Sequence, residues 1–424
     1  MSNVQSLNRQ TAAEAQILQA YGAALSDLPG DGAVMVARDR LLNALKTEGL
    51  PTRRIESWHY TDLRTLLKSV PAASTELADA VEPVVAGSPV LSLSGGKASA
   101  SAPVEGLTVA RYADWLGNGE AATALAERDR DDAIGRINGA FVRDGYALDV
   151  PAGAEIAEVI ELQANQAGGQ SHVRFPVRFG AASKAVVIER HRAAGDSPAL
   201  VSSVTDMVLE DGAEITWIIL QQQGLADTHL GQIKIELKTD AKLRLFVINA
   251  GGKLVRQEIH VVTAGSGSDL TLRGVNLLGG DSHTDVTLTL GHDVPDTTST
   301  EIIRSVVFDR AKGVFQGQIR VAQDAQKTDA RMACNTLLMS DEAEFSVKPE
   351  LEIFADDVQC AHGATVADID RVHLYYLMAR GIPRKAARAL LVNAFVAEIV
   401  EELEDEALVE ALEGVIADWL EKHG

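Results

Sequence analysis

Short apolar segments separated by glycine, aspartate and serine fill the centre of the chain. From residue 144 to residue 360 they have the length of β-strands and recur roughly every 12 to 16 residues, with no helix-length segment between them. The run is long for one sandwich, and a closed barrel needs longer strands. In a stacked β-solenoid each coil hydrogen-bonds only to its neighbours, so the pattern can repeat freely. We therefore predict a β-solenoid, with strands at 155–162, 173–179, 184–190, 213–220, 232–237, 242–248, 254–262, 269–277, 284–290, 300–308, 314–321 and 331–338.

Both flanks of this core have helical periodicity, so the fold is predicted to be mainly β with helical ends. Because the open ends of a solenoid expose unpaired strand edges, we expect the flanking helices to cap them. The prediction has four regions: an N-terminal helical region (1–70), a linker and mixed segment (71–143), the β-core (144–360) and a C-terminal helical region (361–424).

A charged and aromatic segment, 51–62, joins the first helices to the linker. We predict that it anchors the chain, with Trp58 and Tyr60 covering the start of the next unit. Arg53 or Arg54 is expected to pair with Glu56.

Two helices are predicted after the core, one over residues 368–380 that ends at Gly381 and one from Pro383 to Leu403. The second has a wide apolar stripe, and a helix apolar over so much of its circumference either packs on two sides or awaits a partner. The predicted partner-binding residues on that stripe are Leu390, Leu391, Ala394 and Phe395.

The stretch 348–365 is where strand character gives way to helix. We predict a last strand at 351–358, a turn in which Gly363 adopts a positive φ, and a helix that begins between Thr365 and Asp368. Cys360 and His362 fall in that turn, and residues two apart in extended backbone point to the same side.

These two residues are candidate soft ligands for a metal. The alternative is that Cys360 is a small buried hydrophobe and His362 only a hydrogen-bonding residue of the turn. One Cys-x-His pair lacks the four ligands of a structural zinc site, so any metal here must be shared with another chain or be transient. Cys334 lies within a predicted strand, where it can belong to the core or face a groove.

Charge and cysteine content narrow the function classes. The chain has 424 residues and a formal net charge of −21, which argues against a nucleic-acid partner. The sequence shows no membrane-spanning stretch or signal-peptide pattern, so we expect a cytoplasmic protein. Its two cysteines cannot form a disulfide framework and are expected to be reduced.

Three blocks of the sequence resemble the SufB/SufD family of iron–sulfur cluster assembly scaffolds. They are Pro-Thr-Arg-Arg with Glu-Ser-Trp-His-Tyr-Thr between 51 and 61, the block 348–365, and Tyr-Leu-Met-Ala-Arg-Gly-Ile at 376–382. SufB-type chains characteristically have Glu-His-Glu-Ala-Thr where this chain has Ala361-His-Gly-Ala-Thr365. With the histidine kept and the carboxylates replaced, the chain looks like a SufD-type member.

The resemblance implies a right-handed parallel β-helix between helical regions, paired with a SufB-like scaffold subunit and bound through its C-terminal helices to a SufC-like ABC-type ATPase. It also implies a non-enzymatic role, with Cys360 and His362 beside a transient iron–sulfur cluster at the subunit interface. No cluster is expected to be stably bound by the isolated chain, for which a homodimer is possible. Cys334 falls roughly where SufB-type chains have a sulfur-receiving cysteine, although SufD-type chains need none there.

Two other functions fit a β-solenoid. One is an enzyme acting on acidic polysaccharide, against which the missing signal peptide and an aromatic content of 4% both count. The other is a self-associating structural solenoid without a metal role. Catalytic turnover by the isolated chain would favour the first, and co-purification with an ATPase would argue against the second.

Overall fold

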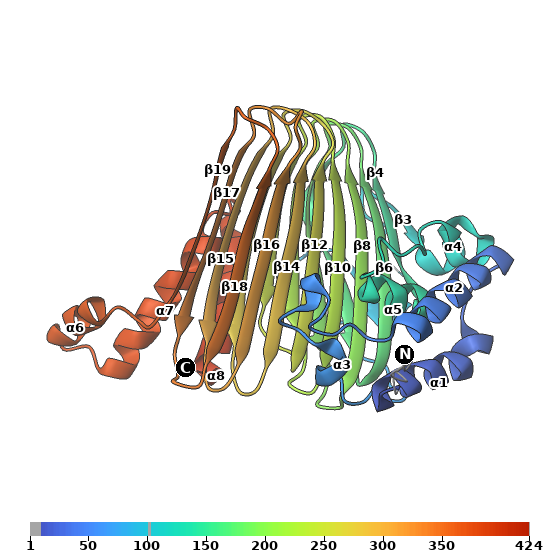
Figure 1. Cartoon of the computed structure of the whole chain (residues 1–424), viewed down its shortest axis with the longest axis horizontal. Coiled ribbons are helices and arrows are strands. Elements are labelled where there is room, and N and C mark those ends of the chain that lie inside the picture. Colours follow the sequence, from blue (N-terminus) through green and yellow to red (C-terminus); the bar gives the residue numbers. More distant parts are fainter. Residues whose placement is uncertain (1–9, 101–102, 424) are drawn as a thin grey trace, which may run out of the picture.

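The computed structural model describes residues 10–100 and 103–423. Two long sheets, stacked face to face, make up the body of the molecule (Figure 1). In those residues, one sheet has the order β19-β17-β15-β13-β11-β9-β7-β5-β1-β2 and the other β18-β16-β14-β12-β10-β8-β6-β4-β3. The chain therefore alternates between the sheets, and each coil hydrogen-bonds to the coils before and after it. The pairing is parallel throughout, except β1 with β2 and β3 with β4. The predicted β-solenoid is confirmed.

The strands are β1 Val90–Ser94, β2 Lys97–Ala98, β3 Thr108–Arg111, β4 Asp144–Val150, β5 Glu155–Gln166, β6 Gly169–Phe179, β7 Lys184–Ala193, β8 Ala199–Leu209, β9 Glu214–Gln222, β10 Thr228–Leu237, β11 Lys242–Asn249, β12 Leu254–Thr263, β13 Asp269–Leu278, β14 His283–His292, β15 Thr298–Val307, β16 Lys312–Val321, β17 Asp329–Leu338, β18 Glu344–Ile353 and β19 Gln359–Ala367. The helices are α1 Ala12–Ala24, α2 Gly32–Glu48, α3 Leu63–Leu66, α4 Tyr112–Asn118, α5 Ala133–Phe141, α6 Arg371–Ala379, α7 Arg384–Val400 and α8 Glu406–His423. Short 3-10 turns occupy Leu25–Asp27, Glu56–Trp58 and Glu120–Ala122.

Strand alternation builds the core between the sheets. In β9, Ile215, Trp217 and Ile219 face the interior and are buried in the main apolar cluster. Ile218 and Leu220 face outward, yet they are buried too, because the C-terminal helices cover that side. Strands covered on both faces are apolar almost throughout, which explains the strong strand signal in the sequence.

One interior row is polar instead of apolar. Six successive strands of the ten-stranded sheet, from β7 to β17, each contribute one buried member in strict register, and we call the set the polar interior row: His191, Gln221, Asn249, Asn276, Ser305 and Thr336. The Asn249 Nδ2 donates to Asn276 Oδ1 at 2.7 Å, and Asn276 Nδ2 donates to Ser305 Oγ at 3.1 Å. These bonds link successive coils. They also favour the observed register, because a slip of one residue would turn the row outward.

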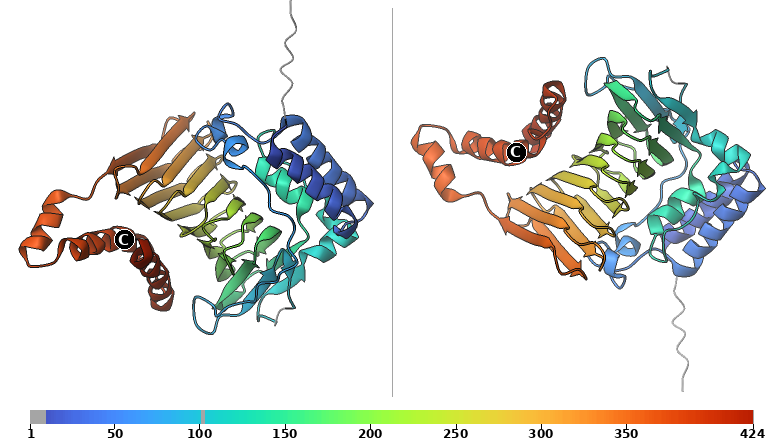
Figure 2. Two further views of the ribbon diagram at one scale, coloured as in Figure 1. Left: turned by 90° about the horizontal axis from the view of Figure 1, so that it is seen from below. Right: turned by 90° about the horizontal axis from the view of Figure 1, so that it is seen from above.

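The N-terminal helices lie on the outer face of the nine-stranded sheet. Helix α5 packs on β6, β8 and β10, and α1 and α2 pack over it (Figure 2). The segment 51–62, which follows α2, contacts the same face of the sheet further along, where Trp58 is fully buried above Arg256. The predicted pairing of Glu56 with Arg53 or Arg54 is wrong, because Glu56 forms its ion pair with Lys348 of β18.

The C-terminal helices do not cap the solenoid, contrary to the sequence-based expectation. Helix α7 lies across the outer faces of β13 and β15, α8 packs beside it, and α6 projects from the body (Figures 1 and 2). The expectation failed because α7 and α8 bury their apolar residues against the face of a sheet. Across residues 10–100 and 103–423, no helix is both long and apolar enough to span a bilayer.

Candidate functional site at the open end

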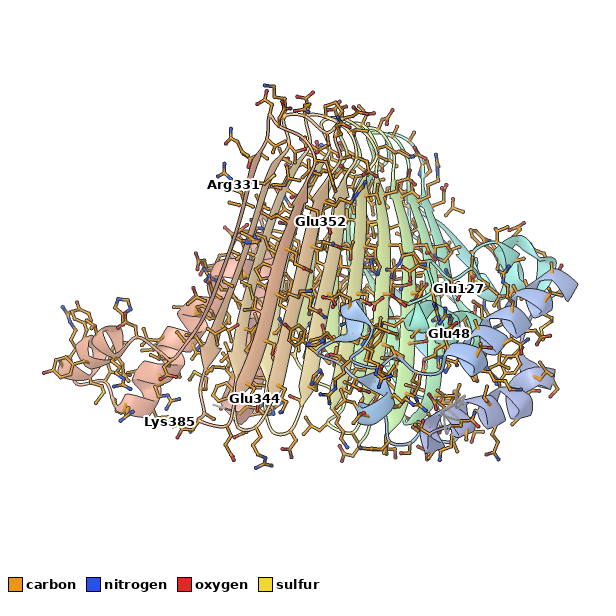
Figure 3. All side chains as sticks on the ribbon, in the orientation of Figure 1. Glu48, Glu127, Arg331, Glu344, Glu352 and Lys385 are labelled. Atoms are coloured by element: carbon orange, nitrogen blue, oxygen red, sulfur yellow. The ribbon has the colours of Figure 1, made fainter. Side chains whose placement is uncertain are left out.

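The last coil ends in two strand edges. Strand β18 pairs with β16, β19 pairs with β17, and neither has a second neighbour in the described part of the chain. The outer face of β18 carries Glu344, Lys348, Glu350 and Glu352, and Figure 3 labels the first and last of these. Charged side chains on an edge strand discourage unspecific pairing with other proteins. The backbone edges themselves remain available for a specific partner.

Cys360 and His362 lie within β19, which corrects the predicted turn. The strand continues to Ala367, past the expected start of the helical region, and α6 begins only at Arg371, capped by the Asp370 side chain. Gly363 lies in extended, paired backbone and takes no positive φ. The glycine suggested a turn, but pairing with β17 holds the segment straight.

The register with β17 shows that Cys360 and His362 face the interior of the solenoid. Cys360 lies opposite Ala330 and His362 opposite Met332, and both of those β17 residues are buried in the main core. The two donors are therefore on the same side of the strand, as predicted. Because no further coil covers them, Cys360 is only half-buried and His362 is exposed. They lie at the mouth of the interior.

Burial raises the pKa of the Cys360 thiol, and the charges of Asp329 and Glu301 raise it further, against a hydrogen bond with the backbone of Ala330. The described residues contain no group of three or more His, Cys, Asp or Glu side chains that could hold a metal ion. Cys360 and His362 are thus an incomplete pair of soft donors.

Cys334 belongs to the core. It lies on β17 opposite Ala364, faces the same interior, and is 1% exposed. Burial raises the pKa of its thiol to about 12, although the Thr336 hydroxyl lowers it somewhat. A buried neutral thiol is a poor nucleophile and a poor ligand.

Sequence reasoning missed Glu301, a fully buried carboxylate on β15 in the same interior row as Met332 and His362. The available signal was strand alternation, because Glu301 stands at an inward position between Ser299 and Ile303.

The helices near this end expose two groups of apolar side chains. On α7, Leu390 and Ala394 are exposed and Leu391 is partly exposed, whereas Phe395 packs against the solenoid beneath the Arg304 guanidinium. The more exposed group lies on α6 and was not predicted as a partner surface. It comprises Val372, Tyr375, Tyr376 and Met378, which are 74, 73, 55 and 40% exposed.

Comparison with known proteins identifies the family to which this chain belongs. The family described as "SUF system FeS cluster assembly, SufBD core domain" matches residues 162–395, just over half of the chain and a range that includes Cys334, Cys360 and His362. The chain belongs to the SufBD family. The predicted family is thereby confirmed, and with it a role in iron–sulfur cluster assembly by the SUF system.

Individual relatives of the chain support the same family assignment. The chain is 29% identical over 389 residues to the iron–sulfur cluster assembly protein SufD of Escherichia coli, covering 88% of this chain and 89% of that protein. It is 27% identical over 286 residues to the chloroplastic protein ABCI7 of Arabidopsis thaliana, covering 64% and 60%. A SufBD family protein of Synechocystis is 30% identical over 200 residues, covering 47% and 44%.

Proposed function

We propose that this SufBD-family chain is a non-catalytic, cytoplasmic scaffold subunit of a SufBCD-like assembly complex. In this role, Cys360 and His362 offer ligands to a nascent iron–sulfur cluster that is the cargo of the complex. The observation that carries the proposal is the incomplete donor pair at the uncovered end of the interior.

The ligand count requires a second chain. Iron–sulfur clusters are commonly held by four ligands, mostly thiolates with some imidazoles. This chain presents one thiol and one imidazole at the open end, since Cys334 is buried. A SufB-like subunit that supplies the remaining ligands completes the site, and the cluster is held only while both chains contribute.

The strand edges provide the means of pairing. A SufB-like solenoid can dock its own edges against β18 and β19, which puts Cys360 and His362 into the shared interface. Without that subunit, a second copy of this chain can occupy the same edges as a homodimer.

A SufC-like ATPase is the proposed partner of the C-terminal region. The exposed apolar residues of α6 and those of α7 (Leu390, Leu391 and Ala394) form one candidate surface, and α6 leads directly from β19. Movement of α6 during nucleotide turnover can therefore act on the strand that carries Cys360 and His362, a rigid-body form of switching.

Anaerobic reconstitution with iron and sulfide tests the proposal. We expect cluster absorption and Mössbauer signals from the chain mixed with its SufB-like partner, and only weak signals from the chain alone. Equal cluster yield without the partner would contradict a shared site. Failure of the two chains to associate would contradict the pairing.

A further inference from the structure

The inner carboxylate Glu301 is unusual in its surroundings. It is 0% exposed and points from β15 into the interior of the solenoid, where the residues beside it in register are Leu272 of β13 and Met332 of β17. Among the described residues, neither carboxylate oxygen forms a hydrogen bond of acceptable distance and angle, although the Ser299 hydroxyl lies near enough to affect the pKa of the carboxyl group. Burying a carboxylate in this way is costly, so such a group calls for a specific explanation.

The same interior shows how a carboxylate can be satisfied. Glu189 of β7 also faces inward, where it is bonded to His191 Nε2 at 2.8 Å, to the Thr205 hydroxyl at 3.0 Å and to the Trp217 indole at 3.1 Å. Glu301 has no comparable set of partners. This difference is expected if its partner is an ion that arrives from outside.

The register places Glu301 toward the open end. Glu301, Met332 and His362 occupy one row on β15, β17 and β19. With neighbouring strands about 4.8 Å apart, the backbones of Glu301 and His362 are separated by roughly 10 Å. Met332 lies between them, and its flexible thioether side chain can yield to a ligand.

The electrostatics of Glu301 agree with this placement. Burial raises the pKa of Glu301 to about 8, despite the opposing effects of the Ser299 hydroxyl and the Arg273 charge.

We propose that Glu301 is the inner anionic residue of the donor site, the charge that balances a divalent cation such as ferrous iron held at Cys360 and His362. The inference rests on the proposed function, because it takes those two residues as the cation ligands. When the cation enters, the Cys360 thiol and the Glu301 carboxyl group each release a proton to solvent, so that the thiolate binds the cation and the carboxylate faces the positive charge. Glu301 is thus a positioning residue, acting through the field inside the solenoid.

Cobalt(II) is a suitable probe, because thiolate coordination gives it a charge-transfer absorption that reports binding directly. Titrations use the full chain and its complex with the SufB-like partner. In the wild type we expect cobalt(II) absorption that His362→Ala weakens. Glu301→Gln keeps the shape of the protonated side chain. We expect it to lower cobalt(II) affinity about tenfold, because it removes the attraction between the cation and one negative charge roughly 10 Å away in a medium of intermediate polarity.

Glu352→Gln is the matched control, because it removes the same charge from the outer face of β18 near the same end (Figure 3). Its effect should be small and vanish in high salt, whereas the effect of Glu301→Gln should persist. If Glu301→Gln fails to fold, Glu301→Leu, which matches Leu272, replaces it.

Unchanged affinity in Glu301→Gln, with loss in His362→Ala, would overturn the role of Glu301 and leave the proposed function standing. Equal losses in Glu301→Gln and Glu352→Gln would also overturn it. Absence of cobalt absorption from both the chain and the complex, or indifference to His362→Ala, would refute the donor site itself and the inference with it.

Discussion

Arg256 lies beneath the indole of Trp58, with its guanidinium carbon 4.4 Å from the ring centroid. The same guanidinium donates to the Ser57 carbonyl at 2.7 Å and pairs with the buried carboxylates of Asp285 and Glu258. One side chain therefore joins the N-terminal segment to two strands of the solenoid.

Loss of either partner should destabilise the fold. We expect Trp58→Ala to lower the free energy of unfolding by about 3–5 kcal/mol through the cavity it leaves. Arg256→Ala should cost a similar amount, because two buried carboxylates lose their counter-charge. Urea unfolding measures both. Arg53→Ala is the control, since its side chain is 74% exposed and lies 3.9 Å from Asp62, and a comparable loss there would contradict the argument.

His362→Ala should leave folding and association with the SufB-like partner intact while lowering cluster yield in anaerobic reconstitution. The side chain is exposed at the open end and supports no packing, so only a ligand is removed. His373→Ala, at an exposed position on α6, is the matched histidine control. Normal cluster yield from His362→Ala would rule out the assignment.

The two thiols should differ in reactivity. In the folded chain at pH 8, iodoacetamide should modify Cys360 well before Cys334, because Cys334 is buried and its thiol pKa is raised to about 12. Mass spectrometry of timed samples distinguishes them. Similar rates under native conditions would show that the end of the interior opens far more than the packing indicates.

Glu301 should make stability depend on pH. Its pKa is raised from 4.5 to about 8 in the folded chain, so the folded state keeps a proton that the unfolded state releases. Its contribution to stability is complete below about pH 4.5 and is lost as the pH rises toward 8, by at most about 1.4 kcal/mol per pH unit. Glu301→Gln cannot ionise, so its stability relative to the wild type should improve between pH 5 and pH 8. A constant difference in urea unfolding would argue against a buried neutral Glu301.

The α6 surface should be required for ATPase binding but not for folding. Replacing Tyr375 and Tyr376 together by alanine removes two exposed rings and is expected to abolish co-purification with a SufC-like ATPase at an unchanged melting temperature. Leu77→Ala, 72% exposed elsewhere, is the control. Retained binding by the double variant would move the contact to α7.

Much of the fold could be predicted, because the strongest signals were local. Helices α1 and α2 lie in the region predicted to be helical, and observed strands such as β11 and β13 begin at the predicted residues. The open end was harder. Gly363 suggested a turn, and only pairing with β17, set by the coil before it, makes the segment a strand.

The candidate site was predicted only in part, because local spacing can be read from the sequence and long-range strand register cannot. Spacing placed Cys360 and His362 on one side, which needs only local geometry. Glu301 is 59 residues before Cys360 in the chain, and only the register of three strands brings it into the row of His362. Likewise, the apolar residues of α6 gave no indication that the helix projects away from the body.

The polar interior row limits where such chains can change in length. Its members stay in register although their spacing in the sequence differs from coil to coil, so the turns between strands can take up added residues, whereas a single extra residue within a strand would invert every later side chain of that strand. Since α7 is anchored on β13 and β15, adding a coil beyond them would carry the thiol and imidazole about 4.8 Å farther from that anchor. The reach between the helical arm and the assembly site can therefore vary only in steps of one strand.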